Sequence, residues 1–133
     1  MRLKLLDTTV AIDYLRGNEQ AASLLRRLVE EAEDPEGALL ASELVRFELL
    51  AGARDSELDA LEQFFSALDW VPVNEEIVRM AGALAREHRA AFSGIDDVDY
   101  LLAATSLILD AALVTTNVRH FPMLDGLEPA YSY

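Results

Sequence analysis

Three aspartates stand at the start of one apolar stretch of this sequence. Residues 94–107 read GIDDVDYLLAATSL, with Asp96, Asp97 and Asp99 directly ahead of an almost wholly apolar run. At about 100° per residue, Asp99 projects in line with small residues of that run, where an ion and its waters have room. We predict that Asp96 caps the helix, that Asp97 faces water and that Asp99 is a ligand. The competing interpretation is a capping box in which Asp99 pairs with Asp96.

Two other polar residues directly follow predicted strands. Asp7 comes after LKLL, and Asn117 comes after ALVTT. In an open α/β sheet, ligands collect at the carboxyl ends of the strands, so both residues are candidates for a site. Each also has a simpler explanation, because Asp7 can cap the next helix and Asn117 can be a turn residue.

Glu48 lies on the apolar side of a predicted helix, SELVRFELLAGA. In projection it falls between Leu44 and Val45, while the polar side of the helix belongs to Arg46. An unpaired carboxylate in such a place costs several kcal/mol, on the order of the penalty for any buried charge. Glu48 is therefore expected either in a buried ion pair with an arginine or as a metal ligand.

Asp7, Glu48 and Asp99 come from three different predicted elements. Hard oxygen ligands of this kind suit Mg²⁺ or Mn²⁺, which keep several waters and bind substrate phosphates. The chain has two histidines, His88 and His120, and they lack the helical spacing of a ligand pair. A zinc hydrolase is therefore not expected.

The elements that must position these residues alternate between strands and helices. That alternation predicts an α/β fold, with a short parallel sheet between layers of helices. Ser42 and Asn74 are predicted helix caps. Strands are expected at 2–6, 38–42, 69–73 and 111–117, with an edge strand at 128–133, and helices at 8–16, 19–33, 43–53, 56–68, 75–91 and 97–110. The core face of the last helix is predicted to be Val98, Leu101, Leu102, Thr105, Ile108 and Leu109.

Composition limits the class of protein further. The chain has 133 residues, 52% of them apolar, which suits a single domain over residues 1–133. It has no cysteine, which excludes disulfides and thiolate metal sites. The apolar run at the N-terminus is too short for a signal peptide core or a membrane span. We therefore expect a soluble, cytoplasmic protein without membrane contacts.

The net charge is −13, from 11 basic and 24 acidic residues. Such a surface repels nucleic acid. A polyanionic substrate would then need a divalent cation, which inverts the local field of a carboxylate cluster. Arg16, Arg46 and Arg119 are candidate contacts to a polyanion, although each is more simply explained as ordinary surface charge. A basic partner protein is also expected.

Four sequence segments resemble one known family. They are LLDTTVAIDYLRG, SELVRFELLAGA, DVDYLLAATSL and LVTTNVRHF, and they occur in the order and at the spacing of the PIN domain. Within that family the chain looks like the VapC-type toxins of bacterial and archaeal toxin–antitoxin pairs. The resemblance covers essentially the whole chain, and it implies a single PIN domain with a small α/β/α fold.

The resemblance also implies an activity, metal-dependent endoribonuclease. It places Asp7, Glu48 and Asp99 as the acids that hold Mg²⁺, with Mn²⁺ as the other candidate ion, and Asn117 at the fourth catalytic position. Some family members carry Asp at that fourth position, so Asn117 weakens a second metal site rather than the first. His120 stands where an acid often precedes the Phe, with no clear consequence.

Hydroxyl groups near these acids are expected to position the acids or the water bound to the metal. The resemblance suggests that Thr8, and either Thr115 or Thr116, orient an acid or a metal-bound water.

The partners that the resemblance implies are an RNA substrate, a VapB-type antitoxin and a second copy of the toxin. The expected assemblies are a homodimer and a toxin–antitoxin hetero-oligomer. An alternative is a catalytically silent PIN-like module that binds a partner and cuts nothing. A third is a phosphoryl-transfer enzyme or receiver with Asp7 as acceptor. It is disfavoured because Thr9 stands where a second acid is wanted and Lys4 is the one lysine.

Overall fold

The computed structural model describes residues 3–132 and contains a parallel sheet between layers of helices. Its strand order is β3-β2-β1-β4, and the three pairings between neighbouring strands are parallel. The four strands are β1 (Leu3–Leu6), β2 (Ala38–Ser42), β3 (Asp69–Val71) and β4 (Ala112–Val114). This arrangement confirms the predicted α/β class.

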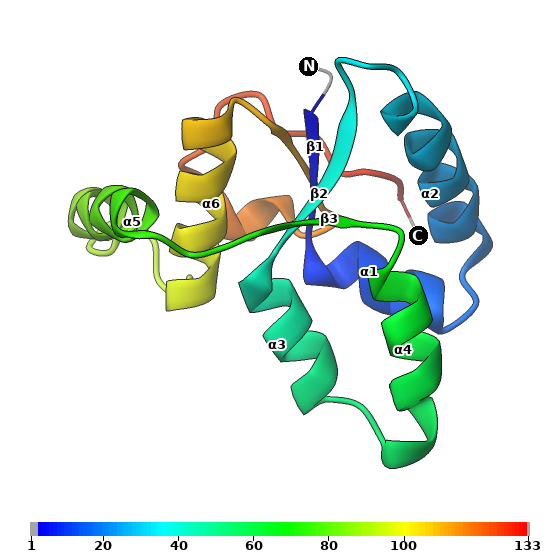
Figure 1. Ribbon diagram of the computed structural model, residues 1–133. Coiled ribbons are helices and arrows are strands. Elements are labelled where there is room, and N and C mark those ends of the chain that lie inside the picture. The colour runs from blue at the N-terminus through cyan, green and yellow to red at the C-terminus, as the bar shows by residue number, and fades with distance from the viewer. Residues whose placement is uncertain (1–2, 133) are drawn as a thin grey trace.

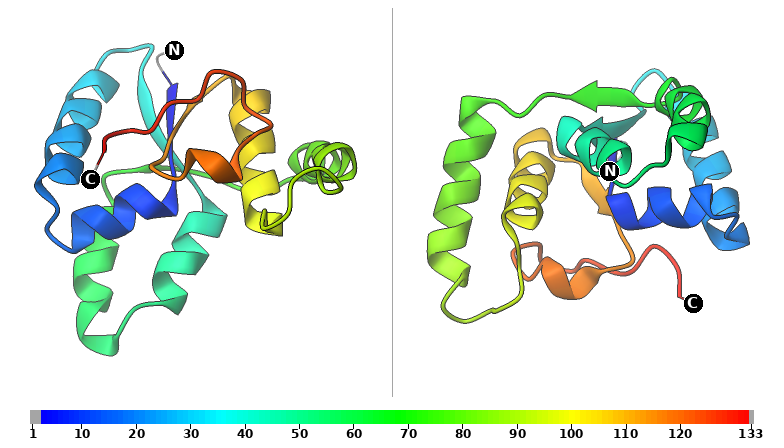
Figure 2. Two further views of the ribbon diagram at one scale, coloured as in Figure 1. Left: turned by 180° about the vertical axis from the view of Figure 1, so that it is seen from behind. Right: turned by 90° about the horizontal axis from the view of Figure 1, so that it is seen from below.

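Helices cover both faces of this sheet. Figures 1 and 2 show α2 on one side and α6 on the other, with α5 packed outside α6. Ser42 and Asn74 cap their helices as predicted. No helix in the described part of the chain is long and apolar enough to cross a membrane. The helices are α1 (Thr8–Leu15), α2 (Glu19–Ala32), α3 (Glu43–Ala51), α4 (Leu58–Phe65), α5 (Glu75–His88) and α6 (Asp97–Leu109), with short 3₁₀ turns η1 (Asp55–Glu57) and η2 (Val118–His120).

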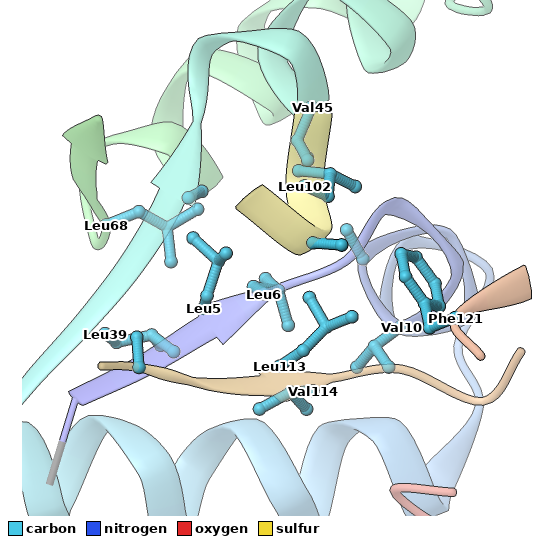
Figure 3. Close-up of a cluster of buried hydrophobic side chains, with 14 of the residues drawn as sticks. Leu5, Leu6, Val10, Leu39, Val45, Leu68, Leu102, Leu113, Val114 and Phe121 are labelled. Atoms are coloured by element: carbon cyan, nitrogen blue, oxygen red, sulfur yellow. The ribbon is translucent and has the colours of Figure 1, made fainter. Parts of the chain in front are cut away.

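The core forms around the two central strands. Leu5 and Leu6 of β1 are fully buried, one on each face of the sheet, because successive side chains of a strand alternate. Figure 3 shows side chains from the strands meeting others from the helices and from the segment after β4. The side chains labelled there are Leu5, Leu6, Val10, Leu39, Val45, Leu68, Leu102, Leu113, Val114 and Phe121.

Two strand predictions at the C-terminal end of the chain need correction. β4 is shorter than 111–117, and residues 128–132 form no strand; Tyr133 lies outside the described residues. The backbone N–H of Ala130 donates to the Thr115 carbonyl at 2.8 Å. Pro129, next to it, has no N–H to continue a ladder of such bonds. The C-terminal segment therefore crosses the end of β4 without pairing along it.

The predicted core face of α6 is confirmed but incomplete. Four of its residues are partly buried and pack against the core, namely Val98, Leu101, Ile108 and Leu109. Leu102 and Thr105 are buried as expected, but Tyr100, Ala103 and Ala104 are buried as well. The reason is that α6 packs against the sheet on one side and α5 on the other (Figure 2), so no single apolar stripe is selected.

Arg46 on α3 helps to hold the β3 edge of the sheet. Its guanidinium carbon lies 3.9 Å from the ring centroid of Trp70 and 5.3 Å from that of Phe65. Its Nε and Nη2 donate to the two carboxylate oxygens of Glu43 at 2.6 and 3.0 Å. These contacts occupy Arg46 on the helix side opposite Glu48, so it is no candidate for a contact to a polyanion at the site.

Arg46→Ala should lower the free energy of unfolding by about 1–2 kcal/mol, because it removes a cation–π contact and a partly exposed ion pair. Urea unfolding followed by circular dichroism measures the change. Arg27→Ala is the matched control, because it removes an exposed 3.8 Å pair with Glu31, and its effect should stay within about 0.5 kcal/mol. Equal effects of the two substitutions would contradict the role assigned to Arg46.

Candidate active site

Asp7 lies at the carboxyl end of β1 and is 6% exposed. Its Oδ1 accepts a hydrogen bond from the Thr8 N–H at 2.8 Å. Asp7 therefore caps α1, which is the simpler of the two explanations given for it above. Its Oδ2 accepts from the Thr115 hydroxyl at 2.7 Å and from the Thr9 hydroxyl at 3.2 Å. Capping therefore uses one carboxylate oxygen, and two hydroxyls from different elements fix the other.

Among residues 3–132, the charge of Asp7 has no positive partner within bonding distance. Burial raises the pKa of its carboxyl, and the hydrogen bonds from Thr115, Thr8 and Thr9 offset only part of that effect. A buried carboxylate of this kind is stabilised by a proton or by a cation.

Glu48 projects from α3 toward the start of α1 and is half-buried. Its Oε1 accepts a hydrogen bond from the Thr8 hydroxyl at 2.7 Å. Thr8 thus joins the two acids, since its N–H bonds Asp7 and its hydroxyl bonds Glu48. The arginine pair proposed for Glu48 is not found among the described residues, which leaves the ligand interpretation in place.

Asp96 caps α6 and Asp97 is exposed to water, as predicted, while the ligand role of Asp99 stays a prediction. Asp96 is the N-cap, and its Oδ1 accepts from the Asp99 N–H at 3.0 Å. The side chain of Asp97 is 88% exposed and pairs with Arg89 at 2.9 Å. The side chain of Asp99 is 13% exposed. Its Oδ2 also accepts from the Asp96 N–H at 3.4 Å, so the capping box and the inward-facing acid coexist.

His120 contacts Asp99, a contact that the sequence did not indicate. Its Nδ1 lies 2.9 Å from Asp99 Oδ2, and its side chain is 40% exposed. The short turn η2 carries it, and the next residue, Phe121, is buried and anchors the turn. Thr9, which bonds Asp7, was not predicted as a site residue. Its position in the first helical turn after Asp7 could have indicated that its hydroxyl lies near that acid.

The pKa of Asp99 is raised to about 6. Burial is the largest cause, and the neighbouring negative charge of Asp96 adds to it, while His120 acts in the opposite direction. The charge of His120 also favours the ionised form of Asp7. His120 therefore lies near enough to influence both acids.

Asn117, the predicted fourth site residue, follows β4 at the same edge of the sheet. Its backbone N–H donates to the Thr115 hydroxyl at 3.0 Å. Its carboxamide makes no hydrogen bond with the acids among the described residues. Thr115 thus links Asn117 to Asp7 through the backbone.

These contacts form two groups, which we call together the acid site. One group is Asp7 with Glu48, joined by Thr8, and the other is Asp99 with His120. Within residues 3–132, no three acidic or histidine side chains already lie close enough to enclose a metal ion. The acid site therefore offers hard oxygen donors and one imidazole at one edge of the sheet, but no closed cage.

A parallel sheet with Asp7 at the carboxyl end of β1 and Asp99 at the start of α6 fits the PIN-domain class. The chain belongs to this family, because the PIN domain model matches residues 4–127. It is 58% identical to Ribonuclease VapC19 of Mycobacterium tuberculosis over 129 residues, covering 97% of this chain and 100% of that relative.

Solved structures share the same fold. A toxin–antitoxin complex from Klebsiella pneumoniae contains a chain with a TM-score of 0.78 and 21% identity, covering 98% of this chain and 99% of its own. VapBC2 from Rickettsia felis, bound to a DNA fragment from its promoter, has a TM-score of 0.77 and 21% identity, covering 94% and 95%.

The raised pKa of Asp99 predicts a pH dependence of stability without metal. Its pKa is about 6 in the folded chain and about 4 in an unfolded chain. The folded state therefore binds more protons between these values, and stability is lost as pH rises through them. Asp99 should lower the free energy of unfolding by about 1–3 kcal/mol between pH 4 and pH 6.

Urea unfolding in EDTA measures this contribution by comparison with Asp99→Asn. The variant should gain stability relative to the wild type as pH rises from about 4 to about 6. Asp97→Asn is the matched control, because Asp97 is an exposed acid two residues away. If Asp99→Asn and the wild type show the same pH slope, the raised pKa is wrong.

Proposed function

We propose that this chain is a divalent-metal-dependent endoribonuclease that acts as the toxin of a toxin–antitoxin pair. Family membership and 58% identity to a protein named Ribonuclease VapC19 support the activity. The observation that carries the proposal is the buried Asp7, held by three hydrogen bonds without a positive partner among the described residues. A cytoplasmic location and a homodimer stay predictions.

The donor chemistry of the acid site fits Mg²⁺, with Mn²⁺ as the other candidate. Asp7, Glu48 and Asp99 would hold the ion through carboxylate oxygens, the ligands that hard cations prefer. Mg²⁺ usually keeps several waters and binds through one or two carboxylates plus substrate phosphates, so it does not need a closed protein cage. When bound, it would stabilise charge on the reacting phosphate and make a bound water more acidic.

The chain's own residues orient the ligands and the substrate. Thr115 and Thr9 fix the oxygen of Asp7 that does not cap α1, and Thr8 fixes Glu48. Such support holds ligands in productive positions and preserves their basicity. We assign Asn117 to the fourth catalytic position, where its carboxamide can donate a hydrogen bond to an oxygen of the RNA phosphate.

Asp99→Asn should reduce RNA cleavage by about 10²–10³-fold in kcat/KM, the usual loss when one electrostatic contact to the reacting group is removed. The assay uses antitoxin-free protein and total RNA with Mg²⁺, Mn²⁺ or EDTA. Asp97→Asn is the matched control and should keep wild-type cleavage, because Asp97 faces water. EDTA should abolish the wild-type activity.

Two results would contradict the proposal in different ways. Full cleavage in EDTA, or full activity of Asp99→Asn, would exclude the metal mechanism. A folded wild type that cleaves no RNA with either ion would favour the alternative, a PIN-like module that only binds a partner.

The antitoxin has a candidate binding surface beside Glu48. A cavity of about 400 Å³ lies between α1, α3 and α4. Leu15, which lines it, is 40% exposed and so offers an apolar contact to a partner. The net charge of −13 favours a basic partner. We propose that an amphipathic, basic antitoxin segment fills this groove and covers the acid site.

Leu15→Ala should weaken binding of the cognate antitoxin about tenfold, since burying a leucine contributes about 1.5 kcal/mol or more. Leu107→Ala, at an apolar α6 residue that is 46% exposed, is the matched control and should bind normally. Calorimetric titration of the two purified proteins measures both. Equal binding by Leu15→Ala and the wild type would place the antitoxin elsewhere.

A further inference from the structure

The two histidines of the chain have very different surroundings. His88 lies on α5, where its Nδ1 is 3.0 Å from the Leu84 carbonyl and its ring lies against Phe92. His120 turns its Nδ1 toward the acid site, 2.9 Å from Asp99 Oδ2. The chain therefore offers one imidazole to that site, with a matched second histidine elsewhere.

The spacing between His120 and Asp99 suits two ligands of a single ion. Two donor atoms about 2.1 Å from an octahedral cation, at right angles, lie about 3 Å apart. The observed Nδ1–Oδ2 distance is 2.9 Å. The same two atoms can therefore share a hydrogen bond without metal and become neighbouring ligands once the bridging proton is released to solvent.

Other features favour a ligand role over an ordinary surface contact. The buried Phe121 anchors η2 beside the acid site, and the His120 side chain stays 40% exposed, so a hydrated ion can reach it. By contrast, the carboxamide of Asn117 makes no hydrogen bond with the acids of that site within residues 3–132.

We propose that Nδ1 of His120 is a ligand of the same divalent cation as Asp99, which gives the metal site one nitrogen donor among carboxylates. This inference rests on the proposed metal-dependent function. Imidazole favours first-row transition ions over Mg²⁺, whose preferred donors are oxygens. The site should therefore bind Mn²⁺ in preference to Mg²⁺ more strongly than a site built from carboxylates alone.

Pulsed electron paramagnetic resonance of the Mn²⁺-loaded protein tests the bond directly, because it detects a ¹⁴N nucleus coordinated to the ion. We expect ¹⁴N coupling in the wild type and in His88→Gln. The coupling should be absent in His120→Gln and in His120→Asp, which replaces the nitrogen donor with an oxygen donor. Circular dichroism without metal verifies that each variant is folded. If His120→Gln does not fold, His120→Asp provides the test on its own.

Metal affinity gives an independent measurement. Removing even an outer partner of a ligand costs about 10- to 100-fold in metal affinity. We therefore expect His120→Gln to bind Mn²⁺ at least about tenfold more weakly. His120→Asp should shift the ratio of Mn²⁺ to Mg²⁺ affinity toward Mg²⁺ by a similar factor, while His88→Gln should leave the ratio unchanged. Calorimetric titration with each ion alone provides the values.

The possible outcomes separate this inference from the proposed function. If the wild type binds Mn²⁺ without ¹⁴N coupling, or if coupling persists in both His120 variants, His120 is not a ligand and the carboxylate metal site still stands. If the folded wild type binds neither Mn²⁺ nor Mg²⁺, the metal-dependent function itself is overturned, and the inference falls with it.

Discussion

The site depends on one constraint, the burial of the Asp7 carboxylate at the carboxyl end of a central parallel strand. A buried charge must have its oxygens satisfied. The sheet supplies the partner: β4 pairs with β1, the Asp7 N–H donates to the Val114 carbonyl at 2.9 Å, and Thr115 follows at bonding distance from Asp7 Oδ2. Residues more than a hundred positions apart in sequence therefore meet because two strands are neighbours.

The sheet order also explains why acids with like charge gather in one place. Because β1 and β2 run in parallel, α1 and α3 both begin at the same edge of the sheet, and Thr8 at the start of α1 can bond Glu48 on α3. α6 begins at this edge as well (Figure 2), and there it presents Asp99. Burial and the neighbouring charge of Asp96 raise the pKa of Asp99 there. The fold keeps these acids close at a cost that a bound cation would offset.

Much of this arrangement was predictable from local sequence patterns. Alternating apolar runs gave the four strands and the helices between them, and short polar residues marked the caps at Ser42, Asn74 and Asp96. Helical projection separated Asp99 from Asp97 correctly, because about 100° per residue is a property of the backbone alone. The core face of α6 was predicted only in part. The sheet covers one side of that helix and α5 the other, so its buried residues do not form the single apolar stripe that a helical projection detects.

The contacts that were not predicted join segments far apart in the sequence. Helical or strand periodicity within one segment gives no information about such contacts. Arg46 stacks on Trp70 from a different element, and His120 reaches Asp99 from a turn whose path depends on β4 ending early. Asn117 is another residue whose contacts the sequence did not indicate. Its position just before η2 was predictable, but the bond from its backbone N–H to the Thr115 hydroxyl was not. The sequence predicted Asn117 for its carboxamide, whereas the contact observed is made by its backbone N–H, which bonds Thr115 directly ahead of the turn that carries His120.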